Sequence, residues 1–174
     1  MLVEGDLFGV PLRLEVGRNP DLVRAEVAGA GRLLDLRSGR IFPDQGAAVA
    51  AADLPEAASL FRYRLALWGG RRLTIAGEKG GYHVMTLLGR TCGEVVVADW
   101  TRPLIGPLVR AVELLQRSEA TLRPRERDAC GAIPFRAYAS RGWPLLAGWE
   151  DQKVFETRRI AMDHQPDERI FQLP

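Results

Sequence analysis

Alternation of apolar and polar residues is the strongest pattern in the chain, and it predicts strands. The segment 7–16, LFGVPLRLEV, ends in a run where leucine and valine alternate with arginine and glutamate. This is the period of two that is typical of a half-buried strand. The segment 32–42, RLLDLRSGRIF, has strand character on both sides of Ser38-Gly39, and it predicts a hairpin that turns at this pair.

The region from residue 61 to residue 100 repeats the alternation, with short glycine-rich turns between the segments. The alternating segments are 61–68, 71–76, 82–88 and 94–100. They predict a four-strand antiparallel meander. Gly69-Gly70 is expected to form its first hairpin, because both central positions of the favoured turn need a positive φ. The stretch GEKGG at 77–81 is expected to form the next turn, since it lacks the Lys-Ser/Thr pair and the following helix of a phosphate-binding Walker loop.

Two other regions have helical patterns. Asp44 and the sequence DLPE at 53–56 resemble helix starts, and they predict two short helices with a break at Asp53. In an alternative interpretation the second helix extends to residue 64 and replaces the start of the strand at 61–68. A longer helix is predicted after Thr101, its expected cap, because apolar residues recur at helical spacing from residue 104 to residue 115. The apolar face of this helix is expected to pack on the sheet.

The combined pattern predicts an α+β fold, with an antiparallel sheet of about six to eight strands and two or three helices packed on one face. Residues 1–174 are expected to form one domain, whose core of sheet and helices spans about residues 7–120. The tryptophan-rich segment 130–174 lacks a clear periodicity apart from a strand candidate at 153–162. It is interpreted as an irregular segment docked on the core.

Composition indicates an ordinary water-soluble domain, with 47% apolar and 26% charged residues. The chain has neither a secretory signal pattern nor an apolar run long enough to cross a membrane, so we expect a cytoplasmic protein with no membrane partner. Cys92 and Cys130 have no CxxC spacing, which leaves two half-buried thiols or a single bridge as alternatives. The net charge of +2 argues against strong non-specific binding of nucleic acid.

Candidate catalytic and metal-binding residues are few. His83 follows a glycine-rich stretch and Asp99 ends a predicted strand, but no GxSxG elbow or other nucleophile motif accompanies them. We interpret His83 as structural, and Asp99 as a cap or as a partner of Arg102. The polar residues between Asp163 and Glu168 are interpreted as a solvated turn rather than a metal site. No cofactor is predicted.

The favoured function is therefore non-enzymatic: a protein–protein interaction module that binds another protein or a second copy of itself as a homodimer. Tryptophan is common at the energetic centres of interfaces, and an apolar C-terminal tail docks on its own domain or on a partner, so the candidate contacts are Trp143, Trp149 and Phe171. One alternative is a nucleic-acid-binding sheet face that uses Arg62, Arg64, Arg71 and Arg72 beside aromatic residues. A further alternative is an enzyme whose site forms around His83, Asp99 and nearby arginines.

Overall fold

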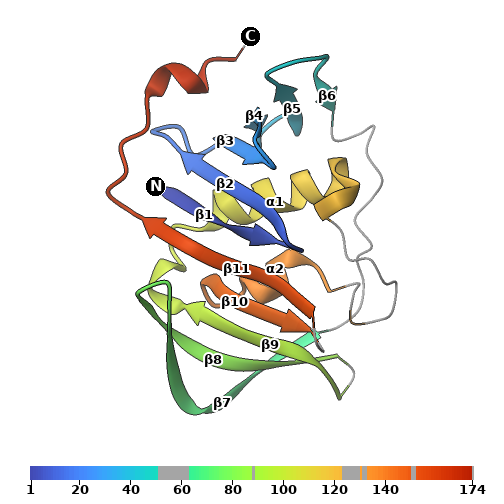
Figure 1. The fold of residues 1–174 in the computed structure, drawn as a ribbon, viewed down its shortest axis with the longest axis vertical. Coiled ribbons are helices and arrows are strands. Elements are labelled where there is room, and N and C mark those ends of the chain that lie inside the picture. Colours follow the sequence, from blue (N-terminus) through green and yellow to red (C-terminus); the bar gives the residue numbers. More distant parts are fainter. Residues whose placement is uncertain (51–62, 88, 123–129, 131–132, 150–151, 174) are drawn as a thin grey trace.

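The computed structural model describes residues 1–50, 63–87, 89–122, 130, 133–149 and 152–173, and in this part of the chain 11 strands form one sheet (Figure 1). The strands are β1 (Leu2–Leu7), β2 (Val10–Val16), β3 (Leu22–Val27), β4 (Ala30–Asp35), β5 (Arg40–Pro43), β6 (Val49–Ala50), β7 (Tyr63–Ile75), β8 (Glu78–Leu87), β9 (Arg90–Ala98), β10 (Trp143–Trp149) and β11 (Gln152–Ala161). The helices are α1 (Gly106–Ser118) and α2 (Phe135–Tyr138), with the short 3-10 turns η2 (Asp99–Thr101), η3 (Ala120–Leu122) and η4 (Glu168–Phe171).

The sheet consists of two meanders that meet at its centre. Its strand order is β6-β5-β4-β3-β2-β1-β11-β10-β9-β8-β7, and every neighbouring pair is antiparallel. The chain builds one half from β1 outward to β6. It then returns from the opposite edge, from β7 to β11, and β11 pairs with β1 (Figure 1). The last strand therefore joins the two halves.

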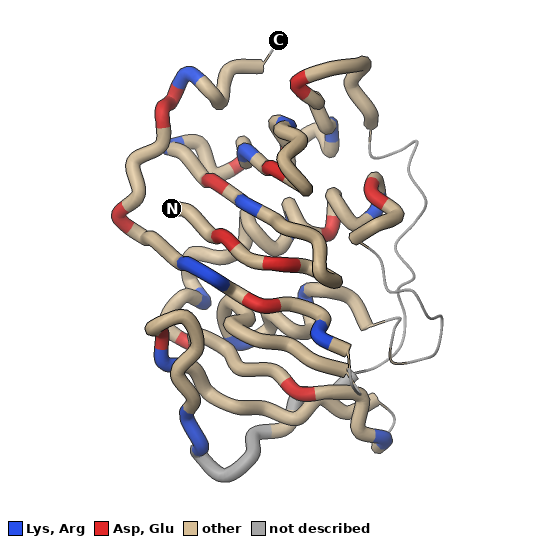
Figure 2. The backbone as a smooth tube through the Cα atoms, viewed as in Figure 1, with Lys and Arg blue, Asp and Glu red and all other residues tan. Residues whose placement is uncertain are grey.

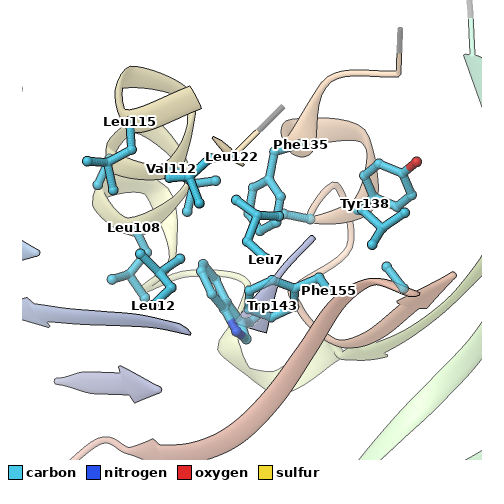
Figure 3. Packing of buried hydrophobic residues seen from close by; sticks show 14 of the residues in the cluster. Leu7, Leu12, Leu108, Val112, Leu115, Leu122, Phe135, Tyr138, Trp143 and Phe155 are labelled. Atoms are coloured by element: carbon cyan, nitrogen blue, oxygen red, sulfur yellow. The ribbon is translucent and has the colours of Figure 1, made fainter. Parts of the chain in front are cut away.

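The two helices cover one face of the sheet. Helix α1 packs against β2 and β3, and α2 packs against β10. The apolar side of α1 carries Leu108, Val112 and Leu115, which are fully buried over the sheet (Figure 3). The outward face of the central strands is charged instead, since Arg13 of β2 pairs with Glu4, and Arg158 of β11 pairs with Asp6. Figure 2 marks the charged positions along these strands, which are separated by uncharged ones. This division explains the alternation in the sequence.

Three aromatic rings form the centre of the core between the sheet and α2. The ring centroids of Phe135 and Trp143 are 5.6 Å apart, and those of Trp143 and Phe155 are 5.5 Å apart in an edge-to-face arrangement (Figure 3). The indole Nε1–H of Trp143 donates a hydrogen bond of 3.1 Å to the Thr157 hydroxyl. The C-terminal segment thus supplies two central strands and much of the core, where the sequence analysis assigned only one strand.

The predicted α+β class with an antiparallel sheet is confirmed, but the described sheet has 11 strands where six to eight were expected. Part of the difference comes from two-residue turns at Phe8-Gly9 and Ala28-Gly29, in which both residues have a positive φ. A residue other than glycine at positive φ is uncommon, and the pairs Phe-Gly and Ala-Gly are not typical turn sequences, so these turns carry a weak sequence signal. The rest comes from β6, β10 and β11.

The hairpin predicted at Gly69-Gly70 is wrong. Residues on both sides of this pair belong to one strand, β7, whose pairing with β8 shifts in register between Leu67 and Arg72. The glycines therefore lie in an irregularity of the strand. The chain turns instead at Ala76-Gly77, where both residues have a positive φ, and Gly80 and Gly81 lie within β8.

The helix predicted to begin at Asp44 is also wrong as far as residue 50, because residues 44–48 form the connection from β5 to β6, and β6 begins at Val49. The Asp44 carboxylate accepts two hydrogen bonds from the Arg24 guanidinium instead of capping a helix. The second predicted helix lies outside the described residues as far as residue 62, and its alternative extension to residue 64 is wrong because β7 begins at Tyr63. Helix α1 begins at Gly106 with Ile105 as its cap residue, so Thr101 does not cap it.

Cys92 of β9 and Cys130 form a disulfide, which resolves the choice between free thiols and a bridge. Both residues are buried, and α1 lies in the stretch of chain that the bridge closes. The bridge therefore ties the segment after α1 back to the sheet.

Candidate functional site

A pocket of about 310 Å³ gathers arginines around one histidine and one aspartate. It is formed by β7, β8, η2 and the turn between α2 and β10. Its lining residues are Arg71, Arg72, Gly81, Tyr82, His83, Asp99, Arg102 and Arg141.

Larger hollows on the surface differ from this pocket in their charge. The hollow of about 640 Å³ beside β1 and β11 is lined by charged residues that neutralise each other, since Arg158 pairs with Asp6 and Lys153 pairs with Glu156. A second, of about 330 Å³, holds the paired Arg24 and Asp44. The pocket around His83, called the arginine pocket below, is lined by four guanidinium groups and only one carboxylate. Because of this excess of positive charge, we regard it as the candidate site.

His83 is the most unusual side chain of this pocket. It is only 1% exposed, and in the described part of the protein neither of its ring nitrogens has a hydrogen-bond partner. Burial lowers the pKa of His83, nearby Arg141 lowers it further, and the Asp99 carboxylate opposes them by raising it. The ring is therefore held neutral, with one donor nitrogen and one acceptor nitrogen unsatisfied. An unmet buried polar group costs about 1–3 kcal/mol.

Asp99 and His83 face each other across a gap. The Asp99 Oδ1 atom lies 3.9 Å from His83 Nε2, and Asp99 Oδ2 lies 4.0 Å from Arg72 Nη2. Both distances exceed a direct hydrogen bond. Gly81 leaves this gap open, because a Cβ atom there would stand 3.1 Å from His83 Nε2 and 3.1 Å from Asp99 Oδ2.

Thr101 and Gly142 hold the two sides of the pocket together. The Thr101 hydroxyl donates a hydrogen bond of 2.7 Å to the Ala98 carbonyl and accepts one of 2.7 Å from the Trp143 N–H. Gly142 has a φ of +153° and packs against the Ala98 backbone so closely that a Cβ would clash. These contacts place Arg141, which precedes Gly142, beside the end of β9 and thus beside Asp99.

The pocket carries a net positive charge. In the described chain, no ion pair joins Arg102 or Arg141 to a carboxylate. The Arg71 guanidinium lies 5.8 Å from the centre of the Tyr82 ring. Burial, followed by a hydrogen bond with Glu94, raises the pKa of Tyr82 to about 12, so this phenol stays neutral. The site would therefore attract anions.

The structure brings together some of the residues that the sequence analysis selected. His83, Asp99, Arg71 and Arg72 share the pocket, as the enzyme hypothesis requires. Arg62 and the side chain of Arg64 lie outside the described residues, so a nucleic-acid face built on all four arginines stays a prediction. Sequence reasoning missed Arg141, because only the fold brings the α2–β10 turn to this place.

The three expected partner contacts lie inside the protein. Trp143 and Trp149 are buried in the main core, and Phe171 of η4 is buried against Gly17. These side chains hold β10 and the C-terminal segment in place. Their role in binding a partner stays a prediction.

The polar residues near the C-terminus make contacts within the chain. His164 Nε2 lies 3.0 Å from the Glu15 carboxylate, Asp167 accepts hydrogen bonds from Arg169, and Glu168 accepts one from the Arg18 N–H. In the part of the chain that the structure describes, no cluster of three or more metal-binding side chains occurs. Neither α1 nor α2 has the length and apolar character needed to cross a bilayer.

Comparisons of the chain with protein-family models, with curated proteins and with solved structures give no match. The pocket itself is therefore the basis for the functional inference.

Proposed function

We propose that this chain is a binding protein for a small anionic ligand, which the arginine pocket holds between His83, Asp99 and the guanidinium groups. The observation that carries the proposal is the neutral, buried and unsatisfied imidazole of His83 at the base of a cationic pocket. Buried polar groups in native proteins are nearly always hydrogen-bonded, so an exception calls for an explanation. A ligand that supplies the missing partner provides one.

The chemistry of the lining favours an anion with several oxygens. Guanidinium groups offer planar sets of donors that match phosphate and carboxylate oxygens. Arg102 and Arg141 are exposed and have no carboxylate partner among the described residues, so they are free to turn toward a ligand. The shared pocket also keeps open the enzyme hypothesis, in which His83 would accept a proton from such a ligand.

The test is a calorimetric titration of the protein with inorganic phosphate and with sulfate. We expect Arg141→Gln and Arg102→Gln each to weaken binding of the better anion roughly ten- to a hundredfold, since each removes charge-assisted hydrogen bonds. Arg110→Gln is the matched control, because Arg110 lies on α1 and pairs with Asp21 outside the pocket. Absence of binding to both anions, or equal binding by all variants, would contradict the proposal.

His83→Leu separates a ligand site from a merely structural histidine. The change removes two unsatisfied nitrogens from a buried position, so the thermal midpoint is expected to stay the same or rise. Anion binding is expected to fall at the same time. A structural histidine would give the reverse result, with lower stability and unchanged binding.

A second candidate function is self-association through the sheet edge. Strand β7 has 13 residues and, in the described structure, pairs on one side only, with β8. Long edge strands present backbone donors and acceptors that a second copy of the chain can pair with. The opposite edge, β6, has only two residues and offers much less.

We expect native mass spectra to contain a homodimer whose fraction increases with protein concentration. Hydrogen exchange of the β7 amides should slow in the dimer, while the amides of β6 serve as the internal control. A monomer at every concentration, or protection elsewhere than β7, would remove this candidate.

A further inference from the structure

We propose that the pocket selects a phosphate group that keeps a proton, and that Asp99 is the residue that recognises this proton. The inference concerns the specificity of the anion site proposed above and rests on it. The arginines alone would accept any small oxyanion of suitable size. The carboxylate among them adds a requirement that only some oxyanions can meet.

Asp99 can only accept hydrogen bonds when it is ionised. Its carboxylate is 44% exposed and sits at the mouth of the gap, 3.9 Å from the buried His83 nitrogen. No side chain at Gly81 stands in front of this carboxylate, where even a Cβ would lie only 3.1 Å from Asp99 Oδ2, so a ligand oxygen that enters over Gly81 can reach Asp99. A ligand oxygen in contact with Asp99 must therefore carry a proton, which it donates to the carboxylate. Without this proton, two negatively charged oxygens would repel each other and no hydrogen bond would form.

The surrounding guanidinium groups impose the opposite requirement. Arg72, Arg102 and Arg141 have donors only, so the other oxygens of the ligand must be acceptors, and the positive charge of the guanidinium groups favours anionic oxygens. Hydrogen phosphate combines one P–O–H with anionic oxygens on a single tetrahedral centre. Sulfate has the same shape but no proton at neutral pH. A phosphate monoester dianion lacks the proton as well, because its second pKa is about 6.

The first experiment compares inorganic phosphate, sulfate and methyl phosphate by calorimetry at pH 8.0. All three carry close to two negative charges there, so their affinities differ mainly through the proton and the methyl group. We expect phosphate to bind roughly ten- to a hundredfold more tightly than either of the others, since an unpaired buried or charged group at the contact weakens binding by this amount. Sulfate binding as tight as phosphate binding would overturn the inference.

Asp99→Asn provides the matched variant, because the amide has nearly the same shape and can donate a hydrogen bond to an ionised oxygen. We expect the preference for phosphate over sulfate to collapse to within about threefold, with sulfate binding more tightly than to the wild type. Loss of the Asp99 charge strengthens the binding of every anion. The ratio of the phosphate affinity to the sulfate affinity cancels this general gain and reports only on the proton. A preference that survives in this variant would show that Asp99 does not read the proton.

The outcomes separate this inference from the function on which it depends. Binding of phosphate and sulfate with equal affinity would retain the anion site and reject proton recognition. Binding of neither anion would reject both. Methyl phosphate identifies the source of the group: if it binds as tightly as phosphate at pH 8.0, the pocket recognises phosphorylated molecules without using the proton, and the inference fails.

Discussion

Trp143→Ala is expected to lower the free energy of unfolding by about 3–5 kcal/mol, the range measured when large aromatic residues are removed from cores. The indole is fully buried and contacts the rings of Phe135 and Phe155. The substitution would leave a cavity between the sheet and α2, and the Thr157 hydroxyl would lose the hydrogen bond that the indole donates. Chemical denaturation monitored by far-UV circular dichroism measures the change.

Trp100→Ala is the matched control, because Trp100 is 46% exposed and follows Asp99 in the same turn. This variant is expected to change stability by no more than about 0.5 kcal/mol. Trp143→Phe should fall between the two, since it keeps a ring but loses the Nε1–H. If Trp143→Ala and Trp100→Ala had equal small effects, the aromatic cluster would not be the centre of the core.

The accuracy of the sequence-based predictions depends on how locally each element is specified. The hairpin at Ser38-Gly39 follows from residues that are neighbours in the chain, and the structure has β4 and β5 on either side of this turn, with Gly39 at a φ of +67°. The apolar side of α1 is also set by local spacing, and Leu108 and Leu115 are buried as predicted. The turn and the buried side of the helix are each determined by residues that lie close together in the sequence.

Strand β10 could not be predicted in this way. Its sequence, WPLLAGW, lacks alternation because both faces of the strand are largely covered: Trp143 is buried in the main core, whereas Leu145, at a register shift, is buried in a separate cluster with Val96 and Ala98. A strand covered on both faces has no polar side to mark its period. The hairpin predicted at Gly69-Gly70 failed because a glycine pair is compatible with more than one unusual backbone conformation. Such a pair can occur in a strand irregularity as well as in a turn.

The candidate site was only partly visible in the sequence. His83 and Asp99 are notable residue types at suggestive places, but no local motif links them to Arg141. Their proximity arises because β8 and β9 are neighbours and β10 pairs with β9, which brings the turn before Trp143 to the end of β9. Gly81 was interpreted as part of a turn, whereas its lack of a side chain keeps the pocket open.

The second large effect is expected for removal of the disulfide. Cys92→Ala combined with Cys130→Ala should lower the free energy of unfolding by roughly 4 kcal/mol, because the bridge closes a segment of 38 residues and restricts the unfolded chain accordingly. For a domain of this size, that change corresponds to a drop of about 8–16 °C in the thermal midpoint. Differential scanning calorimetry of the double variant and the wild type measures it.

Treatment with a reductant distinguishes the contribution of the disulfide to stability from the contribution of the packing of the two cysteine side chains. Wild-type protein treated with a strong thiol reductant should lose about as much stability as the double variant, whereas the variant itself should not respond. If the wild type melts at the same temperature with and without reductant, the bridge contributes no stability.

The bridge also bears on the predicted cytoplasmic location, because disulfides form and persist mainly in oxidising compartments. Alkylation of the protein directly in its source cells, followed by mass measurement, reports whether Cys92 and Cys130 are blocked or free. A fully bridged population would argue against a reducing cytoplasm, and the stability of the bridged form would then be the relevant one. Free thiols in the cell would support the cytoplasmic prediction and would mean that the protein works there with the lower stability of the unbridged chain.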